Sequence, residues 1–151
     1  MKRTAFLIIG ATAAFAAMAT AEITADDVVF DEYGSVAMSL TGVAGDAANG
    51  RDLFKNRKLG NCLACHKNTD LSDQAFQGEV GPSLDGVGDR WNEEELRGIV
   101  SNPKNTFEDT IMPAFYRTSG FFRTLEKFEG KSILSAQDVE DVIAYLQTLT
   151  E

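Results

Sequence analysis

Cys62-Leu63-Ala64-Cys65-His66 is the stretch of this 151-residue sequence that decides its fold. Two thiols three positions apart can each form a thioether with one vinyl group of a haem. The histidine that follows them can turn its imidazole onto the iron. The spacing therefore predicts one covalently attached c-type haem, bound through Cys62 and Cys65, with His66 as an axial iron ligand.

Other uses of this motif fit the composition less well. A structural zinc ion usually has four protein ligands, whereas the chain contains two cysteines and one histidine in all. A thioredoxin-like redox pair requires a βαβ context, which the sequence lacks. A disulfide is possible in an oxidising compartment, but such a small ring constrains little and leaves His66 without a role. The disulfide is the main alternative to haem attachment.

The second axial ligand has to be a residue other than histidine, because His66 is the only one. Beyond residue 21 the methionines are Met38, in an irregular N-terminal segment, and Met112, in a loop before Pro113 that can fold across the ring. We favour Met112. In the alternative, Met112 only fills the core, and the sixth position is open or taken by lysine. Ligation by histidine and methionine raises the reduction potential, which suits electron transfer better than catalysis.

Three further residues are candidates for contact with the haem or its ligand. The free ring nitrogen of an axial histidine usually donates to a carbonyl, and the backbone oxygen of Pro82 is our candidate. Arg90 and Trp91 are candidates to hold a haem propionate, through a charge-assisted hydrogen bond and an indole donor. The alternative for this pair is a surface arginine and a core tryptophan.

Residues 1–21 have the pattern of a secretory signal. They start with Met-Lys-Arg, continue with an apolar stretch and end with Ala19-Thr20-Ala21 just before Glu22. The alternative is a membrane anchor, but the stretch is rich in alanine and short for a span. We therefore expect cleavage after Ala21, export to the periplasm and no membrane insertion afterwards.

The mature chain, residues 22–151, is long enough for one small domain. Its net charge is −11 instead of −9, because the signal removes Lys2 and Arg3 and no acidic residue. Such an acidic surface is unsuited to nucleic acid or anionic lipid. The charge keeps an exported protein soluble or steers a basic partner.

Three segments have the caps and apolar periodicity of helices. Asp46 can cap a first helix that runs into Cys62, and Asn92 can cap a second that stops at Pro103. Ser135, with Asp138 three residues on, can cap a last helix that ends the chain. We expect residues 22–45 to form an arm laid on the domain, and residues 67–90 and 104–134 to be long loops around a large apolar object.

These features together resemble class I c-type cytochromes. The matching residues include Gly50 and Phe54, the haem motif, Gly81-Pro82-Ser83-Leu84, Met112-Pro113 and Ala144-Tyr145-Leu146. The resemblance implies an all-α class I cytochrome c fold over residues 46–151, with three to four helices and long loops around the haem. It also implies that the first and last helices cross, with Gly50 and Phe54 facing Tyr145.

More narrowly, the chain is similar to the SoxX family, the small cytochrome subunits of periplasmic SoxAX complexes in sulfur-oxidising bacteria. Residues 81–91 (Gly-Pro-Ser-Leu-Asp-Gly-Val-Gly-Asp-Arg-Trp), residues 110–116 and the arm carry this similarity. It implies a heterodimer with a larger SoxA-like cytochrome subunit. That complex is an L-cysteine S-thiosulfotransferase, which oxidatively joins thiosulfate to a cysteine thiol of a carrier protein.

In this interpretation the present chain is not the catalyst alone, since both cysteines are used by the haem. It accepts electrons and passes them to a downstream cytochrome. The alternative is a free periplasmic electron shuttle. A haem-based ligand sensor is a third class, which would require an open sixth position on the iron.

Overall fold

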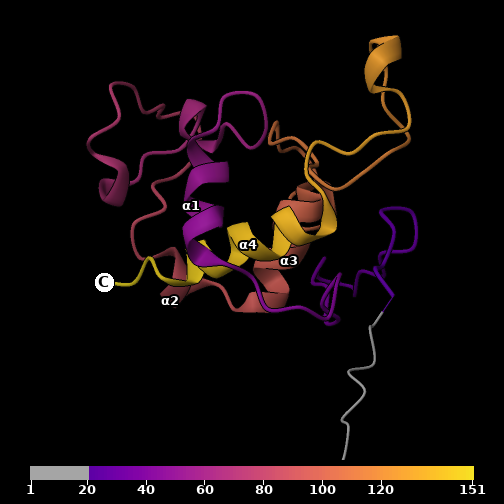
Figure 1. The fold of residues 1–151 in the computed structure, drawn as a ribbon, viewed down its shortest axis with the longest axis horizontal. Coiled ribbons are helices and arrows are strands. Elements are labelled where there is room, and N and C mark those ends of the chain that lie inside the picture. The colour runs from indigo at the N-terminus through magenta and orange to yellow at the C-terminus, as the bar shows by residue number, and fades with distance from the viewer. Residues whose placement is uncertain (1–20) are drawn as a thin grey trace, which may run out of the picture.

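The computed structural model describes residues 21–151, so all but one residue of the expected signal peptide lie outside the described residues. The α-helices are α1 (Ala47–Lys55), α2 (Val87–Arg90), α3 (Glu93–Ser101) and α4 (Ala136–Gln147). Short 3-10 helices lie at Cys62–Ala64, Thr69–Leu71, Pro103–Asn105 and Glu126–Phe128. Because residues 21–151 contain helices and no strand, the predicted all-α class is confirmed (Figure 1). None of the helices in this part of the chain is both long and apolar enough to cross a membrane.

The helices begin at the residues that the sequence marks as caps. The Asn92 side chain accepts a hydrogen bond from the Glu95 backbone N–H at 3.0 Å, and Glu95 accepts one from the Asn92 N–H at 2.8 Å. Ser135 and Asp138 form the same reciprocal box at the start of α4. Such boxes satisfy amide groups that the first helical turn leaves without partners.

The predicted extension of the first helix to Cys62 is wrong, because α1 ends at Lys55. Asn56 has extended backbone and its carbonyl accepts from the N–H groups of Leu59 and Asn61, which closes a turn. Gly60 then passes so close to the end of α1 that a Cβ there would lie 2.7 Å from the Leu53 carbonyl oxygen. The haem motif therefore begins on a separate turn.

The segment 67–90, expected to be a loop throughout, contains the 3-10 helix Thr69–Leu71 and one α-helical turn. Gly86, with φ +66, leads into the four-residue helix α2. That conformation is in the left-handed region, which glycine adopts without steric cost. The turn lies against the end of α4, since the Gly88 N–H donates to the carbonyl oxygen of Leu149, two residues after that helix, at 3.0 Å.

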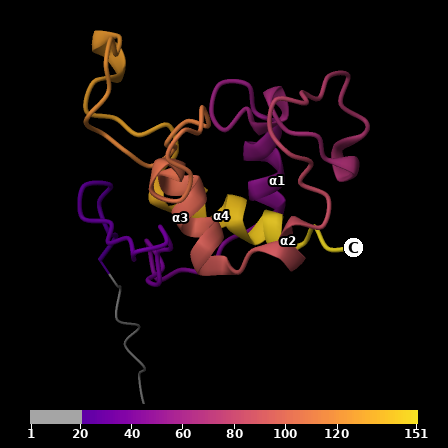
Figure 2. The ribbon, with the colours of Figure 1, turned by 180° about the vertical axis from the view of Figure 1, so that it is seen from behind.

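The centre of the molecule is the crossing of α1 and α4, which both views display (Figures 1 and 2). A Cβ on Gly50 would lie 1.9 Å from the Asp141 carbonyl oxygen, so only glycine allows the backbones to approach this closely. Phe54 meets Tyr145 edge to face, with ring centroids 5.6 Å apart. The predicted crossing and its three residues are therefore confirmed.

The N-terminal arm is held by a buried ion pair that the sequence analysis missed. Arg97 of α3 and Glu140 of α4 are only 2% and 4% exposed, and the Arg97 Nε lies 2.9 Å from the Glu140 Oε1. The Leu40 N–H donates to the same Glu140 oxygen at 2.6 Å, and Arg97 donates to the Val36 carbonyl oxygen at 2.9 Å. Buried charges need this full set of partners, so the arm belongs to the packed structure.

Residues 117–132 form a projection that we call the aromatic lobe. In both views this loop, drawn in orange, stands out from the helices (Figures 1 and 2). Its two limbs meet at the base, where the N–H groups of Ile133 and Leu134 donate to the Phe115 carbonyl oxygen at 3.0 and 2.9 Å. Phe115 and Tyr116 lie in the core just before the lobe begins.

Candidate haem-binding site

The two cysteines lie on the 3-10 turn at Cys62–Ala64 and the residue after it. The Cys62 carbonyl oxygen accepts from the N–H groups of Cys65 and His66, at 3.1 and 2.9 Å. Both thiols are partly buried and neither takes part in a disulfide. Burial raises the pKa of the Cys62 thiol to about 12, so this group is an uncharged thiol at neutral pH.

The His66 imidazole is oriented by the loop that follows the motif. Its Nδ1 lies 2.8 Å from the Pro82 carbonyl oxygen. Because a carbonyl can only accept, Nδ1 carries the proton and Nε2 keeps a lone pair that a metal can take. This is the contact expected from the sequence, and it holds the ring in a single tautomer.

Glycines allow this loop to lie directly on the motif. A Cβ on Gly81 would be 2.4 Å from the nearest atom of the His66 ring, and a Cβ on Gly78 would be 2.0 Å from the Ala64 carbonyl oxygen. The Gly81 N–H donates to the Cys65 carbonyl oxygen, and the Gly78 N–H donates to the Leu63 carbonyl oxygen, both at 2.8 Å. The backbone at Gly78 and Gly81 therefore packs against the haem motif and fixes the orientation of the His66 ring.

Arg90 and Asp85 hold the same loop in place. Arg90 donates to the carbonyl oxygens of Ser83 at 2.9 Å and Asp85 at 2.6 Å. The Asp85 carboxylate accepts from the Thr69 N–H at 2.7 Å and from the Thr69 hydroxyl at 2.8 Å. That backbone hydrogen bond lowers the pKa of Asp85, so the carboxylate is ionised at neutral pH.

This clamp changes how Arg90 is understood. Two of its donors bind loop carbonyls next to Pro82, so it supports the orientation of His66. A propionate contact stays a prediction for Arg90, and so does one for Trp91, which packs on the core with its ring 6.0 Å from that of Phe107. Asp85 was missed, because its carboxylate binds Thr69, 16 positions earlier, and no local pattern marks that pairing.

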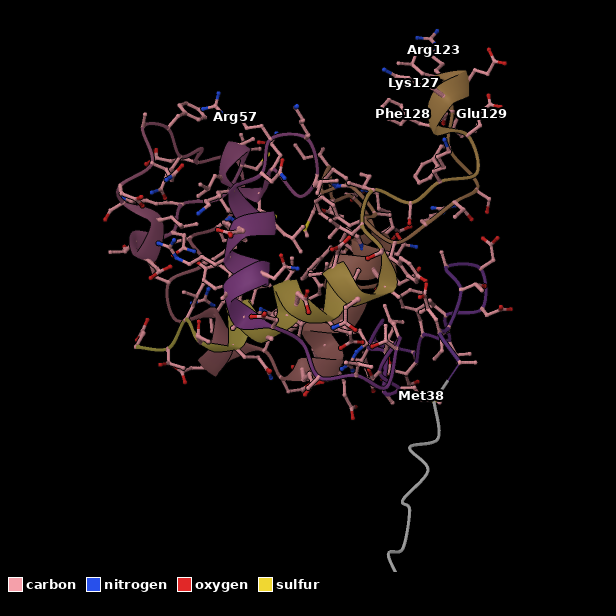
Figure 3. All side chains as sticks on the ribbon, viewed as in Figure 1. Met38, Arg57, Arg123, Lys127, Phe128 and Glu129 are labelled. Atoms are coloured by element: carbon pink, nitrogen blue, oxygen red, sulfur yellow. The ribbon has the colours of Figure 1, made fainter. Side chains whose placement is uncertain are left out.

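The two methionines of the described chain lie in different surroundings. Met112 is partly buried and packs against the hydrophobic core, whereas Met38 is 69% exposed on the arm. Figure 3 places Met38 on the far side of the molecule from Arg57, which lies just before the haem motif. Met112 is also fixed by its backbone, since the Lys104 ammonium donates to its carbonyl oxygen and to that of Thr110. Met112 as the second ligand stays a prediction. The structure adds that the backbone of this residue is held by Lys104.

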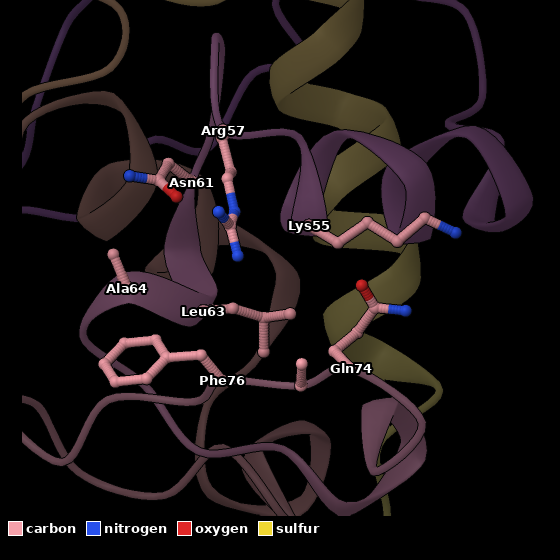
Figure 4. A pocket seen from close by; sticks show the side chains of 8 residues that line it. Lys55, Arg57, Asn61, Leu63, Ala64, Gln74 and Phe76 are labelled. Carbon is pink, nitrogen blue, oxygen red and sulfur yellow. The ribbon is translucent and has the colours of Figure 1, made fainter.

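A hollow lies on another side of the motif, between the end of α1 and the loop at 74–76 (Figure 4). The intervening residues Leu63 and Ala64 line it, together with Lys55 and Phe76. Neither of the two cysteines lines this hollow, and His66 does not line it either. The candidate haem site is therefore defined by Cys62, Cys65 and His66 and not by this hollow.

The residues present fit a c-type haem. Two uncombined thiols stand on one turn, and the next residue offers an imidazole whose Nε2 lone pair is available. The glycine backbone at Gly81 leaves space for that imidazole and for no side chain of its own. This donor set matches covalent attachment at two sulfurs and ligation from one face.

A family model described as cytochrome c matches residues 47–150. The chain therefore belongs to the cytochrome c family, as an all-α, class I protein with one covalently bound haem. Comparison with solved structures narrows this further: a chain of SoxXA from P. pantotrophus is 48% identical, with a TM-score of 0.81 over 87% of this chain and 100% of that one. Within the cytochrome c family, the chain belongs to the SoxX group.

Two other solved structures share less with the chain. The c-type cytochrome SorU from Sinorhizobium meliloti is 27% identical over 69% of this chain and 90% of its own, with a TM-score of 0.46. Ferric cytochrome c-550 from Paracoccus versutus is 19% identical over 71% and 99%, with a TM-score of 0.40. No curated protein sequence matches this chain.

Proposed function

We propose that this chain is the electron-accepting subunit of a periplasmic SoxAX-type complex that oxidises thiosulfate. The observation that carries the proposal is the 48% identity to a SoxXA chain over that chain's whole length. In such a complex, thiosulfate and a cysteine thiol of a carrier protein form an S–S bond, and one proton and two electrons are released. This chain would take those electrons one at a time and pass them to a downstream cytochrome.

The residues of this chain have distinct parts in that function. Cys62 and Cys65 would attach the haem, and His66 and Met112 would ligate its iron. Bound in this way, the haem supplies reversible storage of one electron. The Pro82 carbonyl holds the His66 ring still, which keeps the iron environment similar in both oxidation states.

The choice of methionine has a direct spectroscopic test. In Met112→Leu the sulfur-to-iron charge-transfer band of the oxidised protein should disappear, whereas Met38→Leu should leave it intact. A separate spectrum tests the sensor alternative. It is recorded after carbon monoxide is added to the reduced wild-type protein at neutral pH. The assignment is wrong if Met38→Leu removes the band, or if the wild type binds carbon monoxide without unfolding.

The subunit assignment is tested by native mass spectrometry of the protein purified from its own periplasm at low salt. We expect a chain that starts at Glu22, carries one haem and forms a stable pair with a larger haem-bearing subunit. A monomer with one haem would instead favour a free electron shuttle, whose electron-transfer rates should then depend strongly on ionic strength. A mature chain that retains residues 1–21 would contradict export by a cleaved signal.

A further inference from the structure

The aromatic lobe exposes large apolar side chains in a short stretch. Phe122 is 98% exposed, and Phe121, Leu125 and Phe128 are exposed as well. Single exposed apolar residues are ordinary on protein surfaces, but four within eight residues of one projecting loop are not. Exposed sets of this kind usually mark a contact with another macromolecule.

The lobe has internal contacts and a helical turn of its own, so it is more than an irregular connection. The guanidinium of Arg117 lies over the Phe121 ring at 5.3 Å, and the ammonium of Lys127 lies over the Phe128 ring at 4.8 Å. One helical turn, Glu126–Phe128, forms its tip. These cation–π contacts hold the Phe121 and Phe128 rings in place before any partner arrives, which lowers the entropy lost on binding.

The charge of the lobe is opposite to that of the remaining chain. Residues 117–132 contain four lysine or arginine residues and two glutamates, a net charge of +2. The rest of residues 22–151 has a net charge of −13. Figure 3 shows Arg123 and Lys127 at the tip of the lobe, beside Phe128 and Glu129. Arg117 and Lys131 supply the remaining positive charge of the lobe. A surface that is both basic and aromatic is suited to a recess with apolar walls and a rim of carboxylates.

We propose that the aromatic lobe docks into the larger cytochrome subunit of the complex, in an apolar recess rimmed by acidic side chains. This inference rests on the proposed function, because it names the surface through which that complex is formed. Phe122 and Phe128 are the anchors that enter the recess. Arg123 and Lys127 pair with carboxylates at its edge.

A second copy of this chain is the less suitable occupant. Two lobes that met symmetrically would bring together two surfaces of net charge +2. A lobe on the acidic body of another copy would be a head-to-tail contact, which continues into an open chain of molecules unless the rotation closes.

A transient acceptor cytochrome is also less suitable. Short-lived electron-transfer contacts are small and polar, so that the partners separate quickly. Aromatic anchors beside an arginine are instead typical of the central residues of stable interfaces. The lobe therefore suits the permanent subunit.

The test measures the dissociation constant between the haem-loaded mature chain and the purified larger subunit, by analytical ultracentrifugation or calorimetry. Phe122→Ser and Phe128→Ser should each weaken binding by roughly 10- to 100-fold, as expected for central aromatic anchors. Lys127→Glu should weaken it as well, and most strongly at low salt. Tyr33→Ser is the control, because Tyr33 is an aromatic residue on the arm whose exposure, 73%, lies between those of Phe128 and Phe122, and it should change binding less than twofold.

Each other outcome has a separate meaning. If the wild-type chain does not bind the larger subunit, the proposed function fails. If it binds and the lobe variants bind equally well, or if only Tyr33→Ser weakens binding, the proposed function stands and the lobe is not the docking element. The inference is also overturned if Phe122→Ser alters the absorption spectrum of the haem, since the lobe would then cover the cofactor, or if it abolishes self-association of the chain.

Discussion

The crossing of α1 and α4 and the aromatic lobe use the same residue types in opposite ways. At the crossing, Phe54 and Tyr145 are buried against each other. In the lobe, Phe122 and Phe128 are exposed, although they are as apolar as Phe54. The difference shows that the crossing is determined by the packing of this chain on itself. The exposed rings of the lobe fit the contact with another subunit that we propose.

The largest effect is expected from Gly50→Val, at the centre of the crossing. Its Cβ would lie 1.9 Å from the Asp141 carbonyl oxygen, and the backbone cannot move aside without separating the two helices. We expect a loss of at least about 5 kcal/mol, comparable to the whole stability of a small domain. Thermal unfolding of the haem-loaded protein measures this loss.

The control is Ala48→Leu, on the exposed side of the same helix, which should leave the melting temperature nearly unchanged. A Gly50→Val protein that melts like the wild type would mean that the helices do not approach as closely as the structure has them.

The next largest effect separates a buried charge from an exposed one. Glu140→Gln leaves the Arg97 guanidinium buried without a full counter-charge, and we expect a loss of about 3 kcal/mol in the free energy of unfolding. Glu126→Gln is the same chemical change on the aromatic lobe, and its effect should stay within about 0.5 kcal/mol. Denaturant unfolding of both variants measures the two values. Equal losses would remove the distinction between core and lobe.

A smaller effect should appear as a pH dependence of stability. Its source is Asp70, which lies in the loop after the haem motif and is hydrogen-bonded to Arg51 of α1 and Tyr145 of α4. The hydrogen bond from Arg51, followed by that from Tyr145, lowers the pKa of Asp70 below its ordinary value of 3.8. A carboxyl whose folded pKa is depressed stabilises the protein above its unfolded pKa, and this contribution is lost as the pH falls through the folded pKa.

Asp70→Asn should therefore destabilise the protein at pH 7 by less than about 1 kcal/mol, since both Asp70 and Arg51 are partly exposed and screened. The difference from the wild type should shrink on titration to below pH 4. A difference that stays constant, or grows, down to pH 3 would contradict this linkage. Unfolding free energies measured at several pH values decide between these outcomes.

The smallest effect on stability is expected from shortening the aromatic lobe. Because its limbs already meet at the Phe115 carbonyl, residues 119–131 can be replaced by a short glycine-serine turn without disturbing the core. The melting temperature of the haem-loaded protein should change by only a few degrees. A large drop would show that the lobe supports the fold, and would weaken its assignment to an external contact.

Local signals in the sequence were sufficient for most of the architecture. The caps Asp46, Asn92 and Ser135 mark the starts of α1, α3 and α4, because a side chain that satisfies the first amide groups is a property of a few adjacent residues. The end of α1 was not predicted, since it depends on how closely Gly60 passes Leu53, which a periodic pattern does not express.

The candidate site was predicted in part for the same reason. The spacing of the haem motif is local, and the Pro82 carbonyl follows from the rule that an axial histidine needs an acceptor. The clamp of Arg90 and Asp85 was missed because Arg90 binds backbone carbonyls, which every residue has, and because the Asp85 carboxylate binds Thr69, 16 positions earlier in the chain. The pair of Arg97 and Glu140 joins residues 43 positions apart, although a charge beside the apolar face of each helix was a signal that could have been followed.

The closed base of the aromatic lobe has an evolutionary consequence. A loop whose ends are pinned together can grow or change its sequence at an entropic cost that rises only with the logarithm of its length. Mutations between the two limbs are then hidden from the selection that maintains the helices, and are visible to selection on the neighbour that the loop meets. Members of this group should therefore diverge fastest between residues 117 and 132, and exchange of this one segment should carry partner preference from one member to another.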